Sequence, residues 1–60
     1  MSSYMLVSET PQEAQLPQEF SERAGYQNGR LTLLANGQES NEVIRKMIRH
    51  GFILREMYEQ

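Results

Sequence analysis

The pattern of apolar and polar residues predicts two short β-strands, one from an apolar run and one from alternation. The first, residues 4–9 (YMLVSE), is apolar and partly β-branched, and a proline follows shortly after it. The second, residues 30–35 (RLTLLA), places Leu31 and Leu33 on one face and lies between two Asn-Gly turn dipeptides. The alternative for this second stretch is the end of a helix capped by Gly37, because leucine and alanine also favour helices.

The segment between these strands, residues 10–25, is rich in Gln, Glu and Pro, a composition typical of a linker. Pro17 suits the first position of a helix and Gly25 suits the residue after its last turn. A two-turn helix over residues 17–24 is therefore the alternative. A helix of this length needs tertiary contacts to persist, and Phe20 is a side chain that can make them.

From residue 40 to residue 59 the apolar residues recur every three or four positions, which predicts one long amphipathic helix. Ser40 is expected to be its N-cap. The apolar face of this helix carries Val43, Ile44, Met47, Ile48, Leu54, Met57 and Tyr58. Gly51 lies near the middle of that face, where a glycine costs up to about 1 kcal/mol relative to alanine. We therefore expect either a close approach of another backbone at Gly51 or a break of the helix there.

Together these elements predict a single small α+β domain over residues 1–60. Its expected architecture is a two-stranded antiparallel sheet packed on a long C-terminal helix, with one short extra helix as an option. A chain of this length buries only about 60% of the surface that its unfolded form exposes, so its stability is marginal. Association with a partner would shield what the small core leaves uncovered.

The composition narrows the chemistry that we expect of this chain. It has 60 residues, no cysteine, no aspartate and one histidine, His50. Disulfides and thiolate metal sites are excluded, and a catalytic pair or a metal cluster would lack the usual side chains. We therefore expect a non-enzymatic protein without a metal, a cofactor or a small-molecule substrate. No apolar run approaches the roughly 20 residues of a membrane span, so we expect a cytoplasmic location and no membrane association.

The net charge of −2 is unevenly distributed along the chain. Residues 1–29 contain four glutamates and one arginine, whereas residues 30–60 contain five basic residues and four glutamates. In the expected helix, Arg45, Lys46 and Arg49 lie close together on the polar face, and with Arg30 they form a group that can meet phosphates. A solvated helix face and an acidic protein partner are the other interpretations.

The apolar side of the expected helix is larger than one short sheet can cover. The candidate partner-binding residues on it are Met47, Gly51, Leu54, Met57 and Tyr58. Methionine suits such a surface because its side chain is flexible and polarisable. We expect another protein or a second copy of the chain, in a homodimer, to cover these residues.

Residues 37–52 (GQESNEVIRKMIRHGF) resemble the second helix of ribbon-helix-helix repressors and antitoxins. Gly37 matches the glycine that ends the first helix of that family, Asn41 matches its Ser/Asn position, and residues 42–45 match its Glu-Val-Ile-Arg run. The resemblance implies a dimeric DNA-binding protein. In such a protein the N-terminus of the second helix, here residues 40–42, contacts DNA phosphates.

Two functions remain open. The first is a protein-binding module, such as an inhibitor, adaptor or accessory protein of bacterial or phage type, which acts through the long helix and an uncovered sheet edge. The second is a dimeric DNA-binding transcriptional regulator of ribbon-helix-helix type. Its contact residues would be Arg30, Ser40, Asn41, Arg45, Lys46 and Arg49. The negative net charge favours the first function.

Overall fold

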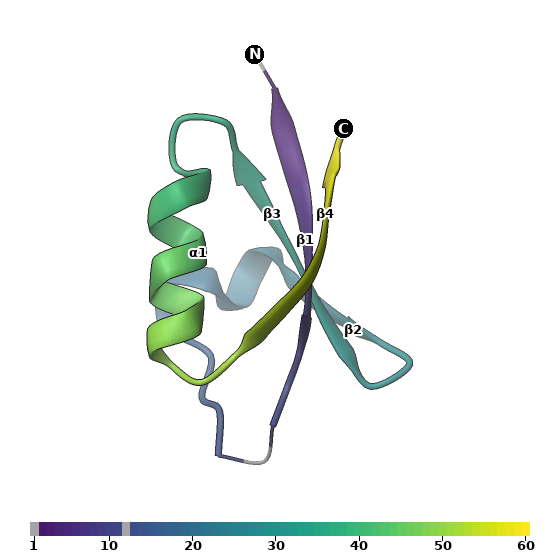
Figure 1. Ribbon diagram of the computed structural model, residues 1–60, viewed down its shortest axis with the longest axis vertical. Helices are drawn as coiled ribbons and strands as arrows, with labels where there is room; N and C mark the ends of the chain where they lie inside the picture. Colours follow the sequence, from purple (N-terminus) through teal and green to yellow (C-terminus); the bar gives the residue numbers. More distant parts are fainter. Residues whose placement is uncertain (1, 12) are drawn as a thin grey trace.

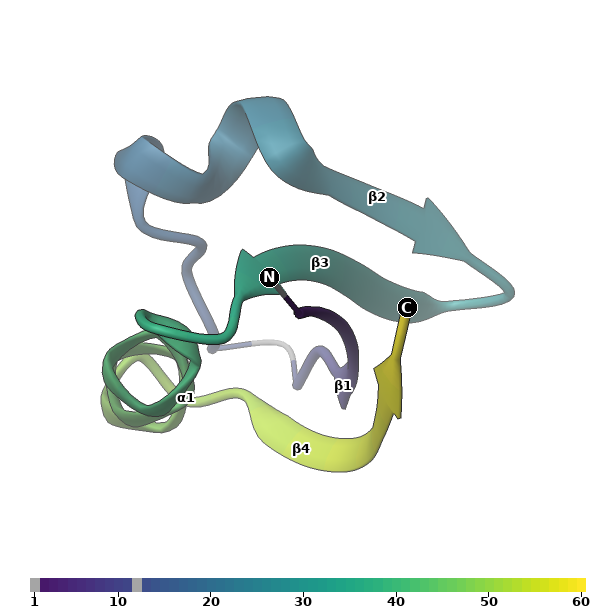
Figure 2. The same ribbon diagram turned by 90° about the horizontal axis from the view of Figure 1, so that it is seen from above.

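The computed structural model describes residues 2–11 and 13–60, in which an antiparallel sheet carries its helices on one face (Figures 1 and 2). In chain order the elements are strand β1 (Ser3–Glu9), 3₁₀ helix η1 (Gln18–Arg23), strand β2 (Ala24–Gln27), strand β3 (Arg30–Asn36), helix α1 (Ser40–Arg49) and strand β4 (Ile53–Glu59). The four strands have the spatial order β2-β3-β1-β4, and every neighbouring pair is antiparallel.

The expected fold class, a two-stranded sheet on a long C-terminal helix, is wrong. The sheet has four strands, and the helix α1 has only ten residues and ends at Arg49. The residues expected to continue that helix form β4, which pairs with β1 at the beginning of the chain. Figure 1 shows the first and last strands side by side, and Ser2 Oγ donates a hydrogen bond of 2.9 Å to Glu59 Oε2 beside them.

Gly51 ends the helix rather than interrupting its middle. Its φ of 97° is left-handed, a conformation that glycine adopts without steric cost. The Gly51 N–H donates to the Ile48 carbonyl at 3.0 Å, and the Phe52 N–H donates to the Met47 carbonyl at 3.0 Å. This pair of hydrogen bonds is the Schellman motif, and the burial of both Phe52 and Met47 supplies its hydrophobic contact. The chain therefore turns back towards the sheet immediately after α1.

The hairpin between β2 and β3 is closed by Asn28 and Gly29. Their φ values of 53° and 77° are both positive, as a two-residue turn of type I′ requires. The backbone twist of such a turn matches the twist of the flanking strands. The Asn-Gly dipeptide thus determines locally where β3 begins.

The core lies between one face of the sheet and the helices. Its members are Leu6, Phe20, Leu31, Leu33, Ala35, Val43, Met47 and Phe52, and each is at most 4% exposed. Alternate residues of β3 contribute to it because successive side chains of a strand point to opposite faces. The helices η1 and α1 lie over that face (Figure 2). Phe20 from η1 and Val43 and Met47 from α1 are their members of the core. Along residues 2–11 and 13–60, no helix has the length and apolar character required to cross a bilayer.

Candidate functional site: the β4 edge and the open face of the sheet

β4 is an edge strand, and two backbone hydrogen bonds reveal the direction of its free groups. The Gln60 N–H donates to the Ser3 carbonyl at 2.8 Å, on the β4 side of β1. The Gly37 N–H donates to the Ser2 carbonyl at 2.7 Å, on the β3 side of β1. Because backbone groups point alternately to the two sides of a strand, odd-numbered residues of β1 bond to β4 and even-numbered ones bond to β3.

The backbone of β4 therefore points outward at Met57 and Glu59. These residues lie opposite Leu6 and Tyr4, the even-numbered β1 residues that direct their own groups to β3. The N–H and C=O groups of Met57 and Glu59 are thus available to a strand laid beside β4. This stretch is the candidate site, and we call it the β4 edge.

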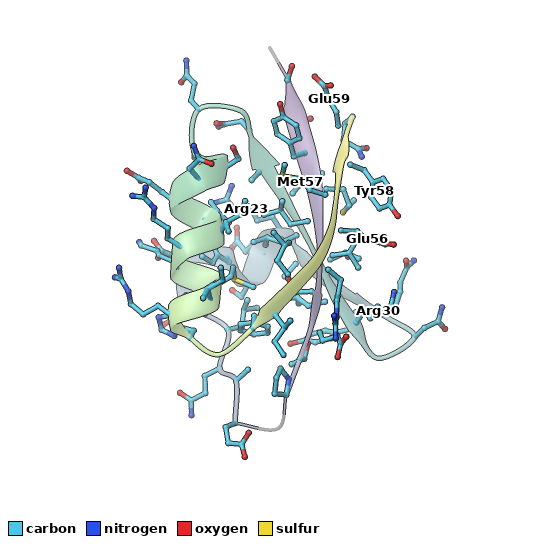
Figure 3. All side chains as sticks on the ribbon, in the orientation of Figure 1. Arg23, Arg30, Glu56, Met57, Tyr58 and Glu59 are labelled. Carbon is cyan, nitrogen blue, oxygen red and sulfur yellow. The ribbon has the colours of Figure 1, made fainter. Side chains whose placement is uncertain are left out.

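Large apolar side chains of β4 remain exposed on both faces of the sheet. Met57 is 50% exposed and shares the helix-covered face with Leu6, its partner on β1. Tyr58 is 51% exposed and Ile53 is 45% exposed, both on the opposite face. Figure 3 shows Met57 and Tyr58 on opposite sides of the β4 ribbon. A strand that paired with β4 would cover part of both side chains.

A β-bulge at Arg55 divides β4 into two parts. Val7 of β1 pairs with Glu56 and Ser8 pairs with Leu54, so Arg55 is the extra residue. The Arg55 guanidinium donates a hydrogen bond to the Glu9 carboxylate. That hydrogen bond is the main reason why the pKa of Glu9 is lowered from its ordinary value. Regular edge geometry is confined to the residues that follow the bulge.

The face of the sheet opposite the helices carries an apolar row across three strands. Met5 of β1 lies between Leu34 of β3 and Tyr58 of β4 in the strand register. Leu34 is 43% exposed, although the neighbouring Leu33 on the other face is buried. We call this surface the open face. Polar and charged residues border the apolar row, including Thr32, Arg30 and Glu56.

Tyr58 and Glu56 interact on the open face, two residues apart on the same strand. The hydrogen bond to the Glu56 carboxylate raises the pKa of the Tyr58 hydroxyl, with smaller contributions from partial burial and from the Glu56 charge. The charge of Arg30 opposes this rise. Figure 3 shows Glu56, Tyr58 and Arg30 on the same side of the sheet. The Tyr58 hydroxyl therefore keeps its proton more strongly than a free tyrosine and remains a hydrogen-bond donor beside the Glu56 carboxylate.

The five residues expected to form one partner-binding helix face are separated in the structure. Met47 is buried in the core at 4% exposure, and Gly51 forms the turn after α1. Leu54 is partly buried against the core. Gly51 is exposed but has no side chain, so Met57 and Tyr58 are the two exposed side chains of this set, and they lie on a strand rather than on a helix. The expected helix face is thus replaced by the β4 edge.

The expected basic group is only partly assembled. Arg45, Lys46 and Arg49 are exposed on α1, and they line a shallow hollow together with Glu42. Lys46 Nζ lies 2.7 Å from Glu19 Oε1, which neutralises one of the three charges. Arg30 lies on the open face, on the other side of the sheet, and does not join them.

The expected DNA contact at the start of α1 is also incomplete. Ser40 is buried and is the first residue of the helix, preceded by Glu39 at the N-cap position, so it is not the N-cap that its sequence suggests. Its Oγ donates to the Gly37 carbonyl at 3.4 Å. Asn41 is exposed. Residues 24–36, immediately upstream, form the β2–β3 hairpin, where the family resemblance implies the first helix.

No group of three His, Cys, Asp or Glu side chains suited to a metal ion occurs in the part of the chain that the structure describes. His50 is exposed at the C-cap of α1, and its backbone N–H donates to the carbonyls of Lys46 and Met47. Its position is that of a helix-terminal residue.

The sequence does contain a signal for β4 that helical periodicity obscured. Gly51 follows Arg49 in the last turn of α1, and glycine after a basic last turn is typical of a helix C-terminus. Beyond it, residues 53–59 (ILREMYE) contain β-favouring Ile and Tyr residues. Ending the helix at Gly51 would have left a seven-residue segment of strand length.

Comparison with known proteins adds no relative. No protein-family model, curated protein or solved structure shows significant similarity to this chain.

Proposed function

We propose that this chain is a small, non-enzymatic protein-binding module that accepts a strand of its partner along the β4 edge. The observation that carries the proposal is the outward backbone of Met57 and Glu59 beside half-exposed Met57 and Tyr58 side chains. Strand addition draws affinity from main-chain hydrogen bonds and specificity from alternate side chains. The β4 edge provides both.

The neighbouring charges make this edge selective. Exposed sheet edges invite indiscriminate pairing, and proteins limit it with bulges and charged residues. Here the bulge at Arg55 limits regular pairing to the stretch that follows it, and Glu56 and Glu59 flank Met57 there. A partner strand therefore needs an apolar residue near Met57 and no acidic residue opposite the glutamates.

A proline at position 57 tests the proposal. Met57→Pro removes the outward N–H without removing a hydrogen bond between β4 and β1, since the Met57 N–H does not point to β1. The wild-type protein, immobilised and exposed to cell extract, is expected to retain protein partners that the Met57→Pro variant loses. Circular dichroism of both proteins checks that the fold is retained.

The matched control changes exposed residues far from the β4 edge. The double variant Arg45→Ala, Arg49→Ala alters only the exposed face of α1 and is expected to retain the same partners as the wild type. Retention of those partners by a folded Met57→Pro variant would contradict strand addition. Recovery of nucleic acid alone by a protein that is also monomeric in solution would contradict the function as a whole.

A second candidate function, DNA binding through α1, has one observation in its favour. Arg45 and Arg49 are exposed and lie one helical turn apart, as phosphate contacts on a helix surface require. If this function holds, duplex DNA at low salt binds the wild type and binds the Arg45→Ala, Arg49→Ala variant more weakly. Either candidate would act in the cytoplasm.

A further inference from the structure

We propose that the strand accepted by the β4 edge is β4 of a second copy of this chain, antiparallel and centred on Met57. This inference rests on the proposed function and names its partner. Met57 is an outward-facing residue, so two copies of it can exchange both N–H···O=C hydrogen bonds as a directly opposed pair. The interface is then isologous, as in most two-fold dimers.

When the two β4 strands are centred on Met57, the side chains of one copy are complementary to the side chains that they face in the other. Glu56 of one copy then lies opposite Tyr58 of the other, twice by symmetry, and both are on the open face. The single Tyr58 hydroxyl hydrogen, which is directed to Glu56 within one chain, then has the Glu56 carboxylate of the second copy as an alternative acceptor. The two half-exposed Met57 side chains cover each other on the helix-covered face.

Other symmetric registers are less favourable. Centring on Glu56 or on Glu59 places two glutamates directly opposite each other, and like charges in that position are destabilising. Centring on Tyr58 places Met57 opposite Glu59 of the second copy, so an apolar side chain faces a charged one. The register centred on Met57 instead places no two like charges directly opposite each other in the stretch that follows the bulge.

The resulting dimer joins the two sheets into one continuous sheet. A two-fold axis perpendicular to the sheet keeps α1 of both copies on the same face. The open faces of the two copies also become continuous. The β4 edge is then covered, and β2 of each copy forms the two outer edges of the combined sheet.

Cysteine placement tests the register directly, because the chain has no cysteine of its own. Met57→Cys brings two thiols to directly opposed positions of a hydrogen-bonded pair, with Cα atoms about 5.5 Å apart, a separation that a disulfide spans. Under mild oxidation this variant is expected to form a covalent dimer. The matched control, Glu59→Cys, points its backbone outward on the same strand, but its copies lie four residues out of register and should not cross-link.

The mass of the unmodified protein in solution provides the second measurement. Sedimentation equilibrium is expected to give twice the 7.0 kDa mass of the chain, and the Met57→Pro variant is expected to give the mass of one chain. A single-chain mass for the wild type, or equal cross-linking of the two cysteine variants, overturns the inference.

These results separate the inference from the function on which it rests. A monomeric wild type that still captures proteins through an intact Met57 leaves the proposed function standing and removes only the second copy as partner. A monomeric wild type that captures no protein contradicts both.

Discussion

The contact between Arg55 and Glu9 joins the bulge of β4 to the end of β1. Both side chains are about half exposed, with 52% of Arg55 and 40% of Glu9 accessible. Exposed ion pairs of this kind add little to global stability because solvent screens them and ordering the side chains costs entropy. Their main effect here is local, since the pair orients the extra residue of the bulge and sets where the regular β4 edge begins.

The lowered pKa of Glu9 predicts a pH dependence of this contact. A carboxylate whose folded-state pKa lies below its ordinary value of 4.5 stabilises the fold above that value and ceases to do so as pH falls through the folded-state pKa. In an NMR titration of the Glu9 side-chain carboxyl carbon, the midpoint is expected below 4.5 in the wild type. In Arg55→Gln it is expected to move up towards the ordinary value. The same midpoint in both proteins would show that Arg55 does not cause the shift.

Among the elements, α1 and β4 depend on each other through the turn at Gly51. The Schellman hydrogen bonds at Gly51 and Phe52 close the helix and bury Phe52 in the core. After the turn, the chain runs along the side of β1 that β3 does not occupy, and there it forms β4. A helix that continued through Gly51 would remove both Phe52 from the core and the last strand from the sheet.

Replacement of Gly51 is therefore expected to destabilise the protein through backbone conformation. A Cβ at this position would lie 3.4 Å from Ala14 Cα, an ordinary contact, so the cost comes from the φ of 97°. Gly51→Ala is expected to lower the free energy of unfolding by about 1–2 kcal/mol, measured in urea. Gly51→Asn should cost less, because asparagine adopts left-handed conformations more readily. Equal stability of Gly51→Ala and the wild type would contradict this account of the turn.

For the whole molecule, a single small core faces only one side of the sheet. A chain of 60 residues at about 0.05–0.15 kcal/mol per residue has a stability of roughly 3–9 kcal/mol. The loss of one core side chain therefore removes a large part of the total free energy of unfolding. The open face, in contrast, contributes little to folding and is available for a partner.

Two adjacent leucines of β3 test this difference between the core-facing side of the sheet and the open face. Leu33 is 1% exposed and Leu34 is 43% exposed, because their side chains point to opposite faces. Leu33→Ala is expected to cost about 2–5 kcal/mol of unfolding free energy. Leu34→Ala is expected to cost less than about 1 kcal/mol, since its methyl groups are already half in water. Urea unfolding of both variants provides the measurement, and equal losses would mean that the open face is covered in the folded protein.

The sequence by itself determined the parts of this fold that depend on neighbouring residues. The Asn28-Gly29 dipeptide specifies a turn because both positions need a positive φ. The alternation that buries Leu31 and Leu33 specifies a strand, since only a period of two places them on one face. The apolar spacing of α1, with Val43 and Met47 in the core, specifies a helix in the same way.

Only the tertiary structure decided where residues 53–59 pair. Gly51 ends the helix locally and leaves a segment of strand length, but nothing in that segment specifies β1 as the strand beside it. The strand prevails because β1, near the other end of the chain, offers the backbone hydrogen bonds that β4 completes, and because Gly51 has already ended the helix. The candidate site follows from that pairing, since the backbone groups of Met57 are directed outward only once β4 lies beside β1.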